Sequence, residues 1–203
     1  MADWDEDSPQ LRANLARVLS SIRKDAFGRA KPTIEAARTW HRDMMQRLDA
    51  PKSEYVGRYR GEPGLEHCEA QIGHHYGVRS NDVGATLIQF EQTLQDAVEA
   101  LDQIIQPDQD ISADQLAAVI ELCAWVHSEW VRVHPFANGN GRTARMWANY
   151  IAMRYGLPPF VRLRPRPDGS YESVAAEAMQ ARWQSTAQVF RQMYSEVVRH
   201  QRR

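Results

Sequence analysis

One histidine, two glycines and two arginines stand close together in the segment 133–145, Val-His-Pro-Phe-Ala-Asn-Gly-Asn-Gly-Arg-Thr-Ala-Arg. His134 comes first, and an imidazole can take up or release a proton near neutral pH. Arg142 and Arg145 are three residues apart, which places them on one face of a helix. These residue types at this spacing indicate an anion-binding site with a proton acceptor beside it.

The residues just before Arg142 indicate how the anion would be held. Glycines allow a close approach of the backbone, and the first N–H groups of a helix have no partner within the helix. Cations in a first helical turn oppose the helix dipole, and a bound anion would remove that cost. The predicted phosphate-binding residues are Gly139, Asn140, Gly141, Arg142 and Arg145.

The run 134–145 also resembles the motif of the Fic (filamentation induced by cAMP) proteins, His-Pro-Phe-x-(Asp/Glu)-Gly-Asn-Gly-Arg-x-x-Arg. It matches at every specified position except Asn138, where the family has an acid. The resemblance covers most of the chain and points to the protein adenylyltransferase type. It implies a mainly α-helical fold in which the motif spans a helix, a loop and a helix, with one short β-hairpin, the flap, beside it.

Fic relatives transfer a nucleoside monophosphate, most often AMP from ATP, to a Ser, Thr or Tyr hydroxyl of a target protein. The resemblance therefore implies ATP or another nucleoside triphosphate as co-substrate, Mg²⁺ as cofactor and His134 as general base. It also places Arg145 toward the γ-phosphate and makes Pro135 and Phe136 positioning residues. A neutral imidazole suits the step, since it can accept the proton of an attacking hydroxyl.

Two departures from the family pattern leave alternatives open. Asn138 offers Mg²⁺ a neutral oxygen in place of a carboxylate, so we expect weak or water-mediated metal binding there. Near the adenine, many relatives have a Tyr-Tyr pair and then Asn, whereas this chain has Tyr171, Glu172 and Met179. The identity of the nucleobase is therefore open. The transferred group could also be a uridylyl, phosphoryl or phosphocholine group, or the reaction could be kinase-like. A further alternative is a Fic fold that only binds nucleotide or protein.

Regulation and partners are expectations of the same kind. Relatives silenced internally carry Ser/Thr-x-x-x-Glu followed by Gly or Asn, and here Ser173 to Glu177 is followed by Ala178. We therefore expect a separate small antitoxin-like partner, as in toxin-antitoxin pairs. A zinc site built from His127, His134 and the pair His74-His75 is less favoured, because the chain lacks His-Glu-x-x-His or Cys-x-x-Cys spacing.

Composition narrows the class of protein. The 203 residues are 43% hydrophobic and carry a formal net charge of −1, which favours one globular domain and gives no overall field for nucleic acid. Arg162, Arg164 and Arg166 are expected at a solvated rim. No apolar run is long enough to span a membrane, and the two cysteines are too few for a disulfide framework. We expect a cytoplasmic, bacterial protein.

Helical spacing and breakers divide the single predicted domain, 1–203, into three parts. Two helices fill 1–52, and a β-hairpin flap fills 54–76. The helical core, 83–199, contains a helix that begins with a Ser112/Gln115 capping box and runs into the motif, and one long last helix from Val174 to Val197. The target-binding residues expected in the flap are Val56, Gly57, Arg58, Tyr59 and Arg60.

Overall fold

The chain folds mainly into α-helices, and the computed structural model describes residues 2–3, 7–72, 74–107, 109–167 and 169–201. The helices are α1 Pro9–Phe27, α2 Ile34–Met44, α3 Ser80–Ile104, α4 Ala113–Val133, α5 Asn140–Arg154, α6 Ser170–Ala178 and α7 Gln184–Gln201, with a 3₁₀ turn at Ser53–Tyr55. The strands are β1 Ala2–Asp3, parallel to β2 Leu48–Asp49, and β3 Gln71–Ile72, antiparallel to β4 His75–Tyr76. The predicted fold class, mainly α with one short hairpin, is confirmed.

Side-chain caps fix where the long helices begin. Ser8 accepts the N–H of Leu11 at the start of α1, and Thr33 accepts an N–H at the start of α2. Both halves of the predicted Ser112/Gln115 capping box are present at the start of α4. Each cap satisfies an N–H that the helix itself leaves without a partner, which sets the register of the chain entering it.

The central helix is α5, in which every residue other than Gly141 is buried. Aromatic rings from three helices meet along it: the ring centroids of Trp147 on α5 and Trp130 on α4 are 5.8 Å apart, and Trp40 on α2 lies 4.7 Å from Trp147. All three tryptophans are buried and belong to the core. A helix buried on all sides places its first turn rigidly.

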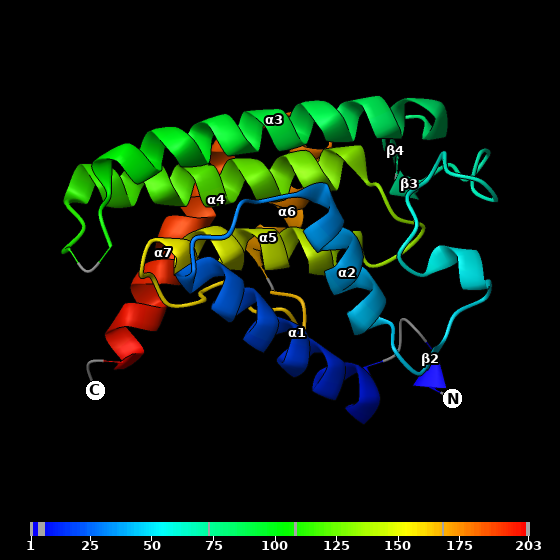
Figure 1. Ribbon diagram of the computed structural model, residues 1–203, viewed down its shortest axis with the longest axis horizontal. Coiled ribbons are helices and arrows are strands. Elements are labelled where there is room, and N and C mark those ends of the chain that lie inside the picture. The colour runs from blue at the N-terminus through cyan, green and yellow to red at the C-terminus, as the bar shows by residue number, and fades with distance from the viewer. Residues whose placement is uncertain (1, 4–6, 73, 108, 168, 202–203) are drawn as a thin grey trace.

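Several elements meet at one end of the molecule. In Figure 1, α2, the hairpin β3–β4 and the loop between α4 and α5 lie together, where α4 ends and α3 and α5 begin. The predicted motif occupies that loop and the first turn of α5. Segments far apart in the sequence therefore surround it.

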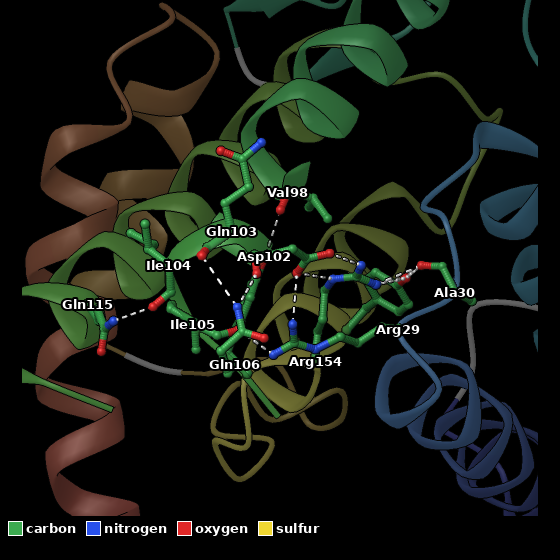
Figure 2. A network of polar contacts seen from close by, with 12 residues as sticks. Arg29, Ala30, Val98, Asp102, Gln103, Ile104, Ile105, Gln106, Gln115 and Arg154 are labelled. Carbon is green, nitrogen blue, oxygen red and sulfur yellow. Dashed lines mark hydrogen bonds and ion pairs between the residues drawn. The ribbon is translucent and has the colours of Figure 1, made fainter. Parts of the chain in front are cut away.

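The opposite end of α5 is held by a polar network (Figure 2). Arg154 donates from Nε to the Asp102 carboxylate of α3 at 3.2 Å and from Nη1 to the Ala30 carbonyl at 2.7 Å. Arg29 forms an ion pair with the same carboxylate at 3.5 Å. The network ties α5 to α3 and to the α1–α2 connection, so neither end of the helix is free to shift.

Three predicted elements differ from the structure. The second helix ends at Met44, so Leu48 lies in β2 instead. The segment 55–60 contains no strand, and among the described residues the hairpin is formed by Gln71–Ile72 and His75–Tyr76. The predicted single helix from 174 to 197 is wrong: it is interrupted at 179–183, where Ala181 has a left-handed φ of 60°, a conformation that a helix cannot contain.

Candidate active site

The loop begins where α4 ends at His134. This residue has a left-handed backbone (φ 53°, ψ 56°), which stops the helix, and its N–H still donates to the Trp130 carbonyl at 3.0 Å. Its Nδ1 lies 3.1 Å from the Val131 carbonyl oxygen. A carbonyl can only accept, so Nδ1 carries the proton and Nε2 keeps its lone pair. The imidazole is thus held as a base.

Burial also favours the basic form of His134. The pKa of the imidazole is lowered to about 4, mainly because the half-buried ring loses solvation when charged. The hydrogen bond to Val131 opposes this shift, and the positive charge of Arg60 adds to it. At neutral pH the side chain is therefore uncharged and able to accept a proton.

The middle of the loop is anchored by Phe136, which is fully buried. Its ring stacks on His41 at a centroid distance of 3.9 Å, and Tyr59 lies 4.8 Å away on another side. Pro135 is also buried. These contacts agree with the expected positioning function of the two residues, although that function itself stays a prediction.

Two asparagines close the turn into α5. The Asn140 side chain accepts the Phe136 N–H and donates to the Phe136 carbonyl, both at 2.8 Å. The Asn138 carboxamide oxygen accepts the N–H of Gly139, the N-cap of α5, which has a φ of 82°. A Cβ at Gly139 would lie 2.9 Å from the methyl carbon of Met44. The positive φ favours glycine there, whereas the methionine methyl group is the end of a flexible side chain and could move aside.

The two motif arginines are buried in the first turns of α5, 4% and 3% exposed for Arg142 and Arg145. Arg142 donates to the Asn138 carboxamide oxygen at 3.4 Å. Arg145 donates from Nη1 to the Tyr171 hydroxyl at 3.1 Å and from Nη2 to the Leu163 carbonyl at 2.9 Å, and its Nε has no partner among the described residues. Two guanidinium groups thus lie in the first two turns of α5, and their binding of an anion stays a prediction.

A buried chain of polar groups continues from Arg145. The Tyr171 hydroxyl that accepts from Arg145 also lies 2.7 Å from Nε2 of His127, a fully buried histidine of α4. Burial lowers the pKa of His127 to about 3, and the charge of Arg145 acts in the same direction. His127 is therefore a neutral core residue, and no group of three metal-binding side chains lies within the described ranges.

Two residues that the sequence did not single out for this purpose hold the loop from outside. His41 on α2 accepts the Gly57 N–H on Nδ1 at 3.0 Å and donates from Nε2 to the Asn138 carbonyl at 2.9 Å. The side chain of Arg60 donates to the backbone carbonyls of Val133 and His134. His41 and Arg60 both bond to main-chain groups. Every residue has such groups, so the spacing of residues in the sequence gave no signal for either side chain.

Comparison with known proteins identifies the family. The model of the Fic/DOC family matches residues 31–152. The chain belongs to the Fic/DOC family. The matched region contains the loop, the hairpin and α2, but ends before α6 and Tyr171.

Named Fic relatives are similar over parts of the chain. Protein adenylyltransferase Fic of Nematostella vectensis is 34% identical over 101 residues, which is 48% of this chain and 24% of that protein. Protein adenylyltransferase fic-1 of Caenorhabditis elegans is 55% identical over 42 residues, 21% of this chain and 8% of that protein. The chain thus spans about a quarter or less of these two relatives.

Solved Fic structures share the fold at low sequence identity. The BepC effector of Bartonella tribocorum, solved with bound AMPPNP, aligns over 95% of this chain and 90% of that one with a TM-score of 0.60 and 18% identity. A Fic-domain protein of Bacteroides thetaiotaomicron aligns over 75% and 51% with a TM-score of 0.57 and 22% identity. The arrangement of helices is therefore that of Fic proteins.

The expected Fic flap needs correction. The target-binding residues predicted for its hairpin, Val56, Gly57, Arg58, Tyr59 and Arg60, instead form an irregular segment after the 3₁₀ turn. Tyr59 is buried against Phe136, and the Arg60 side chain is buried under the end of α4. Their side chains face the motif, so a target could meet only the exposed Arg58 and the half-buried Val56 among them.

The side chain expected to bind Mg²⁺ does not fit direct ligation in this conformation. The carboxamide oxygen of Asn138 already accepts from Gly139 N–H and from Arg142, which uses both of its lone pairs. It is also neutral, whereas Mg²⁺ is usually held by carboxylates and phosphates. Direct ligation of Mg²⁺ by Asn138 would therefore require the carboxamide to give up these hydrogen bonds.

Proposed function

We propose that this protein transfers a nucleoside monophosphate, in the first instance AMP from ATP, to a hydroxyl group of a target protein. The observation that carries the proposal is the state of His134: its Nδ1–H is tied to the Val131 carbonyl, and Nε2 is left basic at the loop that leads into α5. The names of the relatives from Nematostella and Caenorhabditis support AMP as the group transferred.

The proposed step follows from the groups present. Nε2 of His134 takes the proton of the target hydroxyl while the oxygen attacks the α-phosphorus, and the bond from the α-phosphorus to the bridging oxygen of pyrophosphate breaks. The N–H groups of the first turn of α5, together with Arg142 and Arg145, face the charge that grows on the phosphate oxygens. These donors are already ordered by the helix and need little rearrangement.

We further propose that any inhibitor of the site is a separate protein, as in toxin-antitoxin pairs. Among the described residues, the partners of Arg145 are Tyr171 and Leu163, and neither is an acid. Glu177, the candidate for an internal inhibitory glutamate, instead accepts from the Ser185 hydroxyl. Purification from the native host without a small companion protein would count against this part of the proposal.

Intact-mass spectrometry tests the transfer reaction. The protein and a His134→Ala variant are incubated with Mg²⁺ and each nucleoside triphosphate in turn, with and without a host lysate. The expected result is a nucleoside-monophosphate adduct on a protein, present only when His134 is intact. An adduct of a different mass would identify another transferred group, and absence of any adduct in every mixture would refute nucleotidyl transfer.

The second candidate is a Fic fold that binds nucleotide without turnover. It is favoured by the engaged amide of Asn138, which offers no carboxylate to a metal. Calorimetry with ATP separates the two: binding without an adduct in the mass assay supports the binding module. In that case Asn138→Asp, which restores the acid of the family motif, is the first change expected to produce transfer.

A further inference from the structure

Arg60 is a charged residue whose side chain is completely buried. Its guanidinium donates to four backbone carbonyls, namely His134 at 2.7 Å from Nε, Cys68 at 3.1 Å from Nη1, and Val78 at 2.6 Å and Val133 at 3.0 Å from Nη2. Its only carboxylate partner among the described residues, Glu69, is more distant at 3.4 Å and half exposed. Carbonyl groups therefore make most of the hydrogen bonds to this charge, and the longer ion pair with Glu69 adds to them.

One set of these bonds fixes the backbone on both sides of the proposed base. The Arg60 side chain holds the carbonyls of Val133 and His134, and the Arg60 N–H donates to the Pro135 carbonyl at 2.7 Å. The last carbonyls of a helix lack partners within it, and a cation near them is favourable to the helix dipole. Three successive peptide planes at the end of α4 are thus set by one residue from a distant segment.

The other set holds the hairpin β3–β4. Cys68 precedes the hairpin and Val78 follows it, so the same guanidinium joins the two chain segments at its base. Glu69, which Arg60 also contacts, accepts the hydroxyl and the N–H of Ser80 at the start of α3. Arg60 therefore connects the hairpin, α3 and the end of α4.

Gly77 shows how closely the hairpin packs on the base. A Cβ placed at Gly77 would lie 2.8 Å from Cβ of His134 and 3.0 Å from Nη2 of Arg60. Real Cβ atoms do not come so near, so any other residue would displace the imidazole or the guanidinium. The segment that leaves β4 is thus in direct contact with His134.

We propose that Arg60 is a positioning residue of the transfer reaction, which fixes the imidazole of His134 relative to the hairpin β3–β4. The inference rests on the proposed function. A guanidinium suits this purpose because it offers five donors in one rigid plane, and a lysine or an apolar side chain cannot span the same set of carbonyls. A misplacement of about 1 Å at a reacting group can cost on the order of 100-fold in rate.

Kinetics of Arg60→Met and Arg60→Lys test the proposal, with Arg191→Met as the matched control. Arg191 lies on the exposed surface of α7 and pairs with Glu121. We expect kcat to fall about 100-fold in Arg60→Met and by less in Arg60→Lys, while KM for the nucleotide and all constants of Arg191→Met stay at wild-type values. Methylguanidinium added to Arg60→Ala should restore part of kcat. Wild-type kcat in folded Arg60→Met would overturn the proposal. A loss of activity that only reflects a smaller fraction of folded protein, and that methylguanidinium does not rescue in Arg60→Ala, would overturn it too.

Gly77→Ala provides a test that removes no hydrogen-bonding group, in case the Arg60 variants do not fold. We expect kcat to fall with an unchanged KM for nucleotide, since the added methyl group must push on His134. Gly84→Ala is its control, because a Cβ at Gly84, on α3, meets nothing within 4 Å. Equal activity of the two alanine variants would contradict the proposed coupling.

A spectroscopic measurement separates failure of this inference from failure of the proposed function. In wild-type protein labelled with ¹⁵N-histidine, the His134 ring should show a protonated Nδ1, as its bond to Val131 requires. The signal should change in Arg60→Lys and Gly77→Ala but not in the two control variants. If wild type transfers no nucleotide, the proposed function fails, and this spectrum alone decides whether Arg60 positions the ring.

Discussion

The two ends of the loop between α4 and α5 are held by different parts of the chain. At the α5 end, Asn140 bonds to Phe136 and Asn138 bonds to Gly139 within the motif, and the remote bond there, from His41 to the Asn138 carbonyl, comes from helix α2 and not from the hairpin. At the α4 end, the backbone around His134 is held by Arg60, which lies 74 positions earlier in the sequence.

This difference separates the two tasks of the site. Because the turn proposed to bind the anion is closed by bonds within the motif and from α2, nucleotide affinity should depend little on the hairpin. Because the base is positioned from the hairpin side, the rate of the chemical step should depend on it strongly. Variants at the α4 end should therefore lower kcat, and variants at the α5 end should raise KM for the nucleotide.

The largest effect is expected for His134→Ala. Loss of a general base typically costs 10²–10⁴ in rate, and nucleotide affinity should not change, since His134 is not among the anion donors. Arg142→Ala is the counterpart at the other end, where loss of a charged hydrogen-bonding group should weaken nucleotide binding by roughly 10–100-fold. Calorimetry and the mass assay on the same preparations measure both quantities.

If the two variants behaved alike, the two ends of the loop would not have separate effects on rate and on affinity. Equal losses of affinity in His134→Ala and Arg142→Ala would mean that the loop responds as one unit. Thermal unfolding of each variant serves as the control, because Arg142 is buried and its removal also affects stability.

Asn140→Ala is expected to destabilise the anion end. The change leaves the N–H and carbonyl of buried Phe136 without their side-chain partner, and unsatisfied buried groups cost about 1–3 kcal/mol each. We expect the free energy of unfolding to fall by roughly 3 kcal/mol, measured by urea titration. Asn81→Ala, at an exposed position of α3, is the control. A change no larger than that of the control would show that Asn140 does not close the turn.

The pH dependence of stability should involve both ends of the loop, because His41, His127 and His134 each lie near an arginine. The pKa values of His41 and His134 are lowered to about 4 and that of His127 to about 3, mainly by burial, with Arg142, Arg60 and Arg145 respectively adding to the effect. An unfolded histidine titrates near 6.5. Between these values the unfolded chain binds more protons, so stability is complete above pH 6.5 and is lost as the pH falls toward 4.

Two measurements check this prediction. The Tm should fall between pH 6.5 and pH 4, and kcat of the folded fraction should stay constant from pH 8 to about 5 and decline near 4. A decline of kcat centred near 6.5 would mean that the base is solvated, in conflict with the half-buried ring. His134→Ala should remove part of the change in Tm and thus identify the share of that residue.

Prediction from the sequence succeeded where the interactions are local. The turn into α5, the Ser112/Gln115 cap and the helices that carry Trp130 and Trp147 follow from spacing within a few residues, and the structure contains them. That the turn binds an anion stays a prediction. The interruption near Ala181 was missed because the apolar spacing continues across it.

The surroundings of the base could not be predicted in the same way. The segment 55–60 has the aromatic and β-branched residues of a strand, yet Tyr59 and Arg60 are used to cover Phe136 and the end of α4. Arg60 bonds to carbonyl groups, which every residue possesses, so no pattern of side chains marks its partners. Such contacts become visible only when the chain has been placed in space.

Tyr171→Phe has the smallest expected effect on the site. It tests whether nucleotide binding at the α5 end of the loop depends on the remote helix α6. The Tyr171 hydroxyl, from α6, accepts from Nη1 of Arg145 and contacts His127, so it competes with a phosphate for one guanidinium donor. Removing the hydroxyl leaves Nη1 of Arg145 and Nε2 of His127 without this partner, so the free energy of unfolding without nucleotide should fall by about 1–3 kcal/mol. Nucleotide binding should tighten by a few-fold, within the tenfold that about 1.4 kcal/mol supports. Phe190→Leu, which changes the other ring packed on His127, controls for looser packing around that histidine. Weaker binding in Tyr171→Phe would mean that the hydroxyl orients Arg145 toward the phosphate, and the anion end would then also depend on a remote helix.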